Sequence, residues 1–372
     1  MRFKSIFGTA AFTVVALLTA PPQSPAAEWQ DEWNKVVAAA KKEGELSCTC
    51  VPVPFVRRLI ETEWAKAYPE IKLSYSPATL PDIEPQITQE RRARQYTRDV
   101  YVWGSSPEMY VWDDQGFLAN LRPLMILPEN TDESKWFGGF ASRFQDEEKR
   151  SVFAVSAPLQ SITIRRDLVP ASELGLPGDL LKPQFKGKWV VWDPRFGGAG
   201  ANVLGWWNFL FGLDGKSGIR ALLAHDPVVV PGPGRNAVTQ MYRNNIPINF
   251  GNTNESDLAP FRNAGFPINV ELLGRDPDRA FLGSGQFGVL IFKDAPHPNA
   301  ATVFLNWIMS RDVNISVIGT ADASARTDVD VKGDGARGAP LPGTRYPFAG
   351  QTEEGIKKYR LPAMKVAREV LK

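Results

Sequence analysis

Histidine and cysteine are scarce in this chain, and the common signatures of catalysis are missing with them. Among 372 residues there are two histidines and two cysteines. Neither His225 nor His297 lies in a zinc-hydrolase motif, and no GxSxG nucleophile elbow occurs. A GxGxxG pattern at 283–288 precedes a strand-like run instead of joining a strand to a helix, so it does not indicate a dinucleotide site. We therefore expect neither an enzyme nor a bound cofactor or metal.

The two cysteines, Cys48 and Cys50, are separated by one residue in a strand-like segment. At this spacing both side chains point to the same face of a strand. A disulfide between them would be strained and would add little stability, so we expect buried or partly buried thiols. A CxC metal or redox site is the alternative, but no second Cys or His cluster accompanies the pair.

Long apolar runs are also absent beyond the N-terminus. There, a short apolar segment from Ile6 to Leu18 follows Arg2 and Lys4 and precedes the small residues Ser24-Pro25-Ala26. This arrangement is typical of a secretory signal peptide, which we place at 1–26. No later run reaches the ~18 apolar residues that span a bilayer. We expect a soluble chain that is exported to the periplasm.

An excess of charge of one sign is missing as well. Of the 43 basic residues two lie in the expected signal peptide, which leaves 41 basic residues against 41 acidic ones. A neutral exported protein is a poor candidate for binding nucleic acid or an anionic membrane surface. Any preference for a charged ligand must then come from a local site.

What the chain does contain is a regular alternation of helix-like and strand-like segments. Apolar residues at helical spacing predict helices, and short β-prone runs predict strands between them. This order predicts an α/β fold with central, mostly parallel sheets and right-handed crossovers. The expected helices are 28–43, 55–68, 82–95, 107–115, 201–212, 217–225, 236–243, 299–310 and 353–372, and the expected strands are 46–50, 71–75, 99–103, 151–157, 161–165, 189–192, 246–250 and 286–292.

The stretch 186–207 carries the strongest indication of a binding site. Its apolar strand, Trp189 to Trp192, is stopped by Asp193-Pro194 and followed by a glycine-rich turn at 197–200. A helix is expected from about Ala201. The unpaired backbone N–H groups at such a helix start, together with the helix dipole, favour a negatively charged group. A plain connection between a strand and a helix is the alternative.

Polar residues in other loops are suited to complete an anion site. Ligands of parallel sheets bind outside the carboxyl ends of the strands, and several of these residues follow expected strands. Their hydroxyls, amides and one guanidinium suit a carboxylate or a phosphorus oxyanion, although each is also a common turn or cap residue. The candidate ligand-binding residues are Trp103, Ser105, Ser106, Gln160, Gly198, Ala199, Gly200, Arg235, Asn252 and Thr253.

Six segments between about Trp33 and Val329 carry a family resemblance: VVAAAKKEGEL, ETEWAKAYPEIKLSY, TRDVYVWG, FKGKWVVWDPR, DAPHPNAATVFLNWIMS and SARTDV. They resemble, in the same order, periplasmic solute-binding proteins of ABC importers, in the branch that includes the ferric-ion-binding proteins. The resemblance implies a type II-like fold of two lobes joined by crossing strands, with the ligand between lobes that close about a hinge. Lobe 1 would be 28–125 plus 260–320, and lobe 2 would be 126–259 plus 321–372.

The departures from that branch concern the ligand. The resemblance places a metal-binding His in the first strand loop, a Glu after the third strand, and two adjacent Tyr at a later strand end. This chain has Val53, Gly104 and the sequence 252–255, Asn-Thr-Asn-Glu, at those positions. Iron(III) needs hard anionic oxygen ligands, and this set lacks them. The family's anion-binding helix start persists at Gly198 to Gly200.

We therefore expect a periplasmic receptor for a small organic anion, a carboxylate, phosphonate or phosphate ester, that works as a monomer. Its partner would be an ABC permease in the inner membrane. Backbone N–H groups of 198–200 would bind the anion and Arg235 would pair with it, while Trp103 or Phe55 would cover an apolar part of the solute. The first alternative is a receptor for iron(III) or a ferric chelate, and a more distant one is an exported hydrolase.

Overall fold

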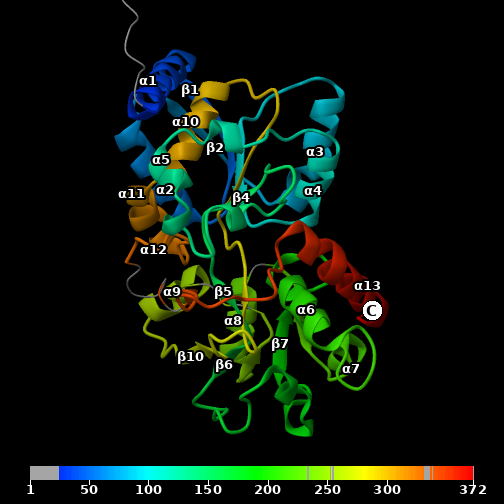
Figure 1. Cartoon of the computed structure of the whole chain (residues 1–372). Helices are drawn as coiled ribbons and strands as arrows, with labels where there is room; N and C mark the ends of the chain where they lie inside the picture. The colour runs from blue at the N-terminus through cyan, green and yellow to red at the C-terminus, as the bar shows by residue number, and fades with distance from the viewer. Residues whose placement is uncertain are drawn as a thin grey trace, which may run out of the picture.

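The computed structural model describes residues 25–232, 234–251, 253, 255–330, 336 and 338–371. Figure 1 shows two α/β lobes, one above the other, each built on a central sheet with helices on its faces. This confirms the predicted fold class. The expected signal peptide at 1–26 lies almost entirely outside the described residues. Among the helices that are described, none is both long and apolar enough to cross a bilayer.

The first lobe contains a five-stranded sheet of order β2-β1-β3-β12-β4. β1 runs parallel to β2 and β3, whereas β12 is antiparallel to β3 and β4. Alternate residues of β3 pack on opposite faces of the sheet. Val100 and Val102 pack with α1, α2 and α10, and Tyr101 packs with α3 and α4. Its elements are α1 (Pro25–Glu43), β1 (Glu45–Cys50), α2 (Pro54–Ala67), β2 (Lys72–Pro77), α3 (Leu80–Arg92), β3 (Val100–Trp103), α4 (Pro107–Asp114), α5 (Pro128–Thr131), β4 (Phe153–Ala154), β12 (Gly288–Ile291), α10 (Pro298–Met309), α11 (Arg311–Val313), η6 (Asn314–Ile318) and α12 (Gly319–Ala321).

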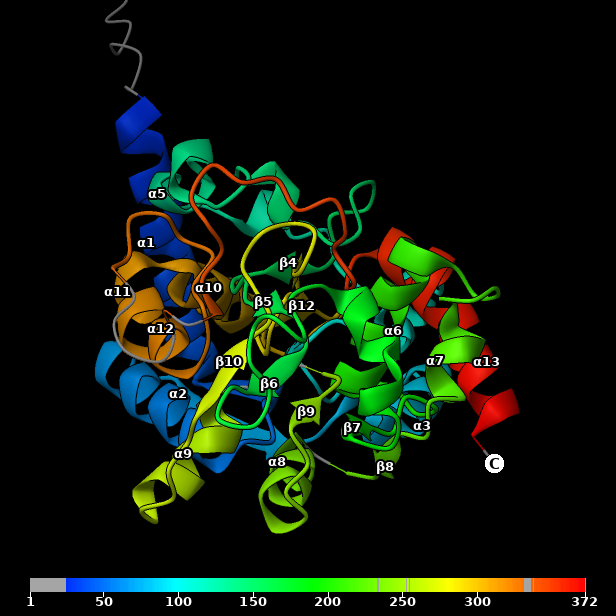
Figure 2. The same ribbon diagram turned by 90° about the horizontal axis from the view of Figure 1, so that it is seen from below.

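The second lobe contains a five-stranded sheet of order β10-β6-β9-β7-β8. β7 lies between β8 and β9 and is parallel to both, while β6 is antiparallel to β9 and to β10. Helix α13 packs beside α6, as Figure 2 shows from below. Its elements are β6 (Thr163–Arg165), β7 (Trp189–Trp192), α6 (Gly198–Phe211), α7 (Ile219–Leu223), β8 (Val228–Val230), α8 (Gly234–Arg243), β9 (Ile248–Asn249), α9 (Glu255–Asn263), β10 (Val270–Leu272), η8 (Gly355–Arg360) and α13 (Leu361–Val370).

Three chain segments connect the lobes. β5 (Leu159–Gln160) leaves the first lobe and pairs antiparallel with β11 (Phe281–Leu282), which returns to it. The third segment forms a parallel bridge between Leu282 and Ala349 before it enters η8. Because the first core extends to Ala157, we propose that the chain crosses near 158 and 283 rather than near 126 and 260.

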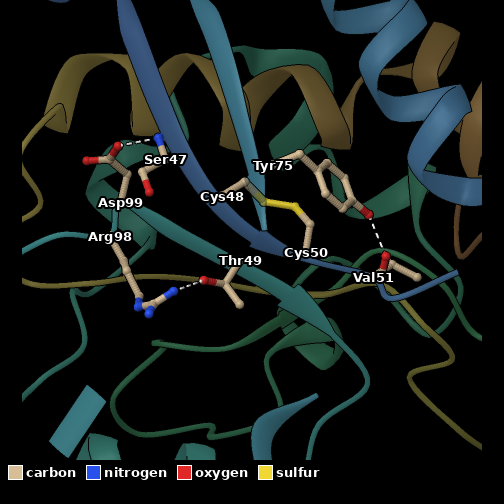
Figure 3. Close-up of a disulfide and its surroundings, with 8 residues drawn as sticks. All are labelled: Ser47, Cys48, Thr49, Cys50, Val51, Tyr75, Arg98 and Asp99. Carbon is tan, nitrogen blue, oxygen red and sulfur yellow. Dashed lines mark hydrogen bonds between the residues drawn. A yellow bond between two sulfur atoms is a disulfide. The ribbon is translucent and has the colours of Figure 1, made fainter. Parts of the chain in front are cut away.

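Cys48 and Cys50 form a disulfide, so the expectation of two thiols is wrong for this structure (Figure 3). The predicted orientation is right, because both side chains lie on one buried face of β1. Their Cα atoms are 5.5 Å apart, inside the usual range for a disulfide. Two residues of a regular strand span about 6.6 Å, so β1 is locally contracted, and this contraction brings the sulfur atoms together.

Hydrogen bonds surround this disulfide on neighbouring strands. Arg98 donates from Nη1 to Oγ1 of Thr49, on the opposite face of β1, at 2.8 Å. The hydroxyl of Tyr75 in β2 donates to the carbonyl oxygen of Val51 at 2.6 Å. Asp99 accepts the Ser47 backbone N–H at 2.7 Å. The bridge is therefore part of the sheet framework, near the loop that follows β1.

Candidate functional site

The start of α6 is the centre of the candidate site. The sequence predicts a glycine-rich turn at 197–200, but the helix already begins at Gly198 with Gly197 as its N-cap. Gly197 has φ 107°, a conformation that favours glycine. A Cβ atom on Gly200 would overlap the carbonyl oxygen of Trp192 at the end of β7. The close approach of strand and helix explains why glycines occupy this turn.

The first-turn N–H groups of α6 lack a side-chain cap. Gly197 has no side chain, and no side-chain hydrogen bond is made at this position within the described part of the chain. Such N–H groups and the positive end of the helix dipole favour an anion. Gly198, Ala199 and Gly200 lie in this first turn. The helix start that the sequence predicts at this turn is therefore present in the structure.

The segment after β9 lies against this helix start. A Cβ atom on Gly251 would lie 3.9 Å from the backbone nitrogen of Gly200. Asn249 donates from Nδ2 to Oγ1 of buried Thr253 at 2.9 Å. The Oδ1 atom of Asn249 is buried and has no hydrogen-bond partner among the described residues. Asn252, another predicted ligand-binding residue, lies outside the described residues.

The carboxyl end of β3 brings residues from the first lobe. Trp103 is half-buried and ends β3, in register with Gly288 of β12. Ser105 is buried, and its backbone N–H donates to Oγ of Ser284 at 3.3 Å. The neighbouring Ser106 is the N-cap of α4, and its hydroxyl donates to the Glu108 carboxylate. The Ser106 hydroxyl is therefore bonded locally at the start of α4 and caps no backbone N–H group of that helix.

Gln160 lies on the crossing strand β5 and is 6% exposed. Its Oε1 atom has no hydrogen-bond partner in the described chain. A Cβ atom on Gly283 would lie 2.8 Å from Nε2 of Gln160 and 2.9 Å from Oε1 of Gln351. These side chains therefore pack where two of the crossing segments meet.

Arg235 is exposed at the second position of α8. α8 follows β8, whose Val230 is in register with Trp192 of β7. Arg235 therefore follows the strand end next to the one that leads into α6. Phe55, which was expected to cover part of the solute, is also exposed, near the start of α2.

The sequence analysis missed Arg360. It ends η8, is 2% exposed, and donates from Nη1 to the carbonyl oxygen of Ser105 at 3.4 Å. A Cβ atom on Gly197 would lie 3.5 Å from its Nη2 atom. The guanidinium thus lies between the start of α6 in one lobe and the end of β3 in the other. Burial lowers the pKa of Arg360 to about 10, which leaves it charged at neutral pH.

A separate groove of about 630 Å³ also lies between the lobes. Its wall includes Phe209, near the C-terminal end of α6, roughly 16 Å along the helix from Gly198. Glutamates outnumber lysines among the lining residues, so this groove does not suit an anion. It is lined by Gln145, Glu147, Glu148, Phe209, Pro347, Phe348, Ala349, Thr352, Glu353, Glu354, Gly355, Lys357, Lys358 and Tyr359.

No group of three or more His, Cys, Asp or Glu side chains is arranged to hold a metal ion among the described residues. Of the three ferric-ligand positions inferred from the resemblance, Val53 has an aliphatic side chain and Gly104 has none. A Cβ atom on Gly104 would lie 2.9 Å from Nε2 of Gln351 and closer still to the carbonyl oxygen of Gly285. A larger side chain at 104 would therefore need its surroundings to shift.

Two α/β lobes, crossing strands and a bare helix N-terminus at their boundary define a solute receptor of the periplasmic-binding-protein type. The chain belongs to the bacterial extracellular solute-binding protein family, whose model matches residues 52–315. Family and fold are those of substrate-binding proteins of the ABC-importer type rather than of enzymes. A comparison with curated protein sequences found no match.

Solved structures with this fold include ferric-binding proteins, the group that the sequence resemblance named. Iron-bound HitA from Pseudomonas aeruginosa is 14% identical, with a TM-score of 0.67 over 88% of this chain and 99% of that chain. A Trichodesmium protein (IdiA, FutA) with iron and citrate is 14% identical, with a TM-score of 0.66 over 88% and 99%. AfuA from Actinobacillus pleuropneumoniae with fructose-6-phosphate is 17% identical, with a TM-score of 0.58 over 86% and 96%.

Proposed function

We propose that this protein captures a small organic anion between its lobes in the periplasm and delivers it, as a monomer, to an ABC permease in the inner membrane. The observation that carries the proposal is the bare N-terminus of α6 with the buried guanidinium of Arg360 beside it. Both favour negative charge, and both lie at the boundary between the lobes.

In this proposal, backbone N–H groups of Gly198, Ala199 and Gly200 bind the oxygens of the anion. Ser105 and Gln160 approach from the first lobe and the crossing strand, and Thr253 approaches from the segment after β9. The sequence prediction adds Asn252, which lies outside the described residues. The unpartnered Oε1 of Gln160 accepts hydrogen bonds, so it suits a donor such as a hydroxyl on the organic part of the solute, because a buried polar atom without a partner is costly. Arg235, although exposed, is proposed to reach the same anion from α8 when the lobes close.

The organic part of the solute would lie against Trp103, which is half-buried at the end of β3. Among proteins with this fold, AfuA holds fructose-6-phosphate, which shows that the architecture accommodates an organic phosphate. This likeness supports the class of ligand that we propose and does not identify the molecule.

Calorimetric titration with a panel of carboxylates, phosphonates and phosphate esters tests the proposal. We expect at least one member to bind, and Arg235→Ala to weaken it by about tenfold, the loss expected for one charge-assisted hydrogen bond. Arg243→Ala, which removes an equally exposed charge from the other end of α8, is the matched control. Unchanged affinity in Arg235→Ala would remove Arg235 from the site, and no binding by any anion would refute the proposal.

A ferric chelate is the second candidate ligand, because HitA is iron-bound and the Trichodesmium protein holds iron and citrate. The described residues offer no cluster of metal-binding side chains, so iron would have to be carried by a chelating anion. Adding ferric citrate distinguishes the two candidates. We expect no visible charge-transfer band, and a stoichiometric band would favour iron.

A further inference from the structure

The Arg360 side chain is buried without an ion-pair partner among the described residues. It is 2% exposed, and its Nε atom has no hydrogen-bond partner among the described residues. No described carboxylate forms an ion pair with it. Burying a charge without a partner is expensive, so a guanidinium in this position indicates a ligand that supplies the opposite charge.

Close helix packing holds Arg360 in place. A Cβ atom on Gly205 of α6 would lie 3.1 Å from the Cα atom of Arg360, so this glycine lets η8 approach α6 closely. From that position Nη2 lies near Gly197 and Nη1 donates to the Ser105 carbonyl oxygen. The guanidinium is thereby directed at the same bare helix start that the proposed function uses.

One carboxylate acts on Arg360 from a distance, and no described carboxylate is paired with it. α6 contains no ionisable residue. From α4, the Glu108 carboxylate acts on Arg360 through space without forming an ion pair, and it also accepts the Ser106 hydroxyl. Tyr110, also in α4, donates to the Gln351 carbonyl oxygen. Burial raises the pKa of Tyr110 well above its usual range, so this phenol is neutral.

Other basic side chains near η8 have hydrogen-bond or ion-pair partners of their own. In η8, Lys357 and Lys358 form ion pairs with Glu353 and Glu354. In α13, Arg368 donates to the carbonyl oxygen of Arg195. Among these described residues, Arg360 is the basic side chain that is buried without an ion-pair partner.

The charge at the helix start matches a doubly charged ligand group better than a singly charged one. A helix N-terminus is equivalent to about half a positive charge, and Arg360 adds a full one. The Glu108 carboxylate offsets only part of this charge, because it forms no ion pair with Arg360. A phosphate monoester carries about −1.5 to −2 at neutral pH, whereas a carboxylate carries one charge. Resting on the proposed function, we propose that Arg360 makes this site select a doubly charged oxyanion, a phosphate monoester or a phosphonate, over a carboxylate.

Small oxyanions test this selectivity without knowledge of the organic part of the solute. We would measure dissociation constants of methyl phosphate, sulfate and acetate from the shift of the thermal unfolding midpoint, at pH 7.5 and pH 5. Methyl phosphate loses most of its second charge at pH 5, since the second pKa of a monoester is about 6. Sulfate stays doubly charged and controls for changes in the protein.

At pH 7.5 we expect methyl phosphate and sulfate to bind and acetate to bind at least tenfold more weakly. At pH 5 the affinity for methyl phosphate falls about tenfold while that for sulfate is kept. Acetate binding as tightly as methyl phosphate, or methyl phosphate binding equally at both pH values, would overturn the selectivity and leave the proposed function intact. If no oxyanion binds at either pH, the proposed function fails as well.

Variants assign the selectivity to Arg360. Arg360→Gln is expected to weaken sulfate binding about 10- to 100-fold, the range for losing a charge-assisted hydrogen bond. Arg360→Lys keeps the charge but not the planar fork, so it should retain part of the affinity. Arg243→Gln removes a distant exposed charge and should change nothing. If Arg360→Gln binds sulfate as tightly as the wild type, the proposed role of Arg360 is contradicted. If that variant does not fold, the pH comparison in the wild-type protein still tests the selectivity.

Discussion

At the scale of single residues, the region between the lobes combines close backbone contacts with buried charges. Gly200 lies against the carbonyl oxygen of Trp192, and Arg360 lies against Gly205. Asp322 is buried near the crossing segments and accepts the backbone N–H groups of Gln286 and Ala323, both at 2.9 Å. Small changes at these positions should therefore have measurable effects.

Gly200→Ala should destabilise the protein, because its Cβ atom would overlap the Trp192 carbonyl oxygen and push α6 away from β7. We expect a loss of about 1 to 3 kcal/mol in the free energy of unfolding, as for other overpacked sites, measured by urea denaturation. Gly178→Ala is the control, since its Cβ atom would meet only Phe211, at 3.6 Å. Equal stability of Gly200→Ala and wild type would show that this contact is not tight.

Asp322 should make the protein more stable as the pH falls toward 5. Burial raises the pKa of its carboxyl to about 6, above the unfolded value of about 3.9. Protonation of Asp322 therefore adds to the free energy of unfolding. This stabilisation is fully present below the pKa of the unfolded state and is lost as the pH rises through 6. Between pH 7.5 and pH 5 this gain is about 1 to 2 kcal/mol.

Urea denaturation of Asp322→Asn across this pH range tests the assignment. The variant should lose the contribution of Asp322 but not that of Asp146, whose pKa burial raises to about 7. Its stability should therefore rise less than that of the wild type on acidification. Parallel pH profiles for the two proteins would rule out Asp322 as a titrating group.

At the scale of elements, β1 is unusual because one strand carries both ends of a disulfide. Cys48 and Cys50 are fully buried, so reductants and alkylating reagents should reach them only after unfolding. Closing such a short loop removes little entropy from the unfolded chain, and the expected contribution of the disulfide is about 2 kcal/mol or less.

Alkylation followed by mass spectrometry tests this element. In the folded, unreduced protein we expect neither cysteine to react, and after reduction in urea we expect both to react. The double variant Cys48→Ala/Cys50→Ala should fold, and urea denaturation should show that its free energy of unfolding is lower by about 2 kcal/mol or less. Two alkylated cysteines in unreduced, unfolded protein would mean that they are free thiols.

Helices and strands that show a clear pattern of apolar residues could be predicted from the sequence. Helices and strands that depend on contacts with distant parts of the chain could not. β7 matches its predicted range because an apolar run ends at Asp193-Pro194. α6 begins three residues before the expected Ala201, at glycines that lie close to Trp192 and have a low helix propensity. α9, β10 and β11 were missed; the two strands are two or three residues long and exist through pairing with β5 and β6.

The candidate site follows the same rule. The helix start at Gly198 was predictable because strand, turn and helix are consecutive in the sequence. Arg360 was not, because it follows Lys357 and Lys358 in a charged segment that is typical of a solvated helix face. Only the packing of η8 on Gly205 directs Arg360 inward, and that contact joins residues 155 positions apart in the sequence.

At the scale of the whole molecule, three thin connections between two lobes permit hinge motion. The Arg360–Ser105 hydrogen bond already joins residues of different lobes, so an anion bound between them should favour a closed arrangement. Small-angle X-ray scattering should show a smaller radius of gyration when the tightest-binding anion of the panel is added. An unchanged radius of gyration at saturation would indicate binding without closure.

The central claim is that the ligand between the lobes is a small organic anion. Receptors that close around their solute often retain it, so native mass spectrometry of protein purified without refolding tests the claim most directly. We predict an added mass that is released on denaturation and detected as an organic anion, with phosphorus if the selectivity of Arg360 is as proposed. Release of iron, or of a neutral solute, would contradict the account.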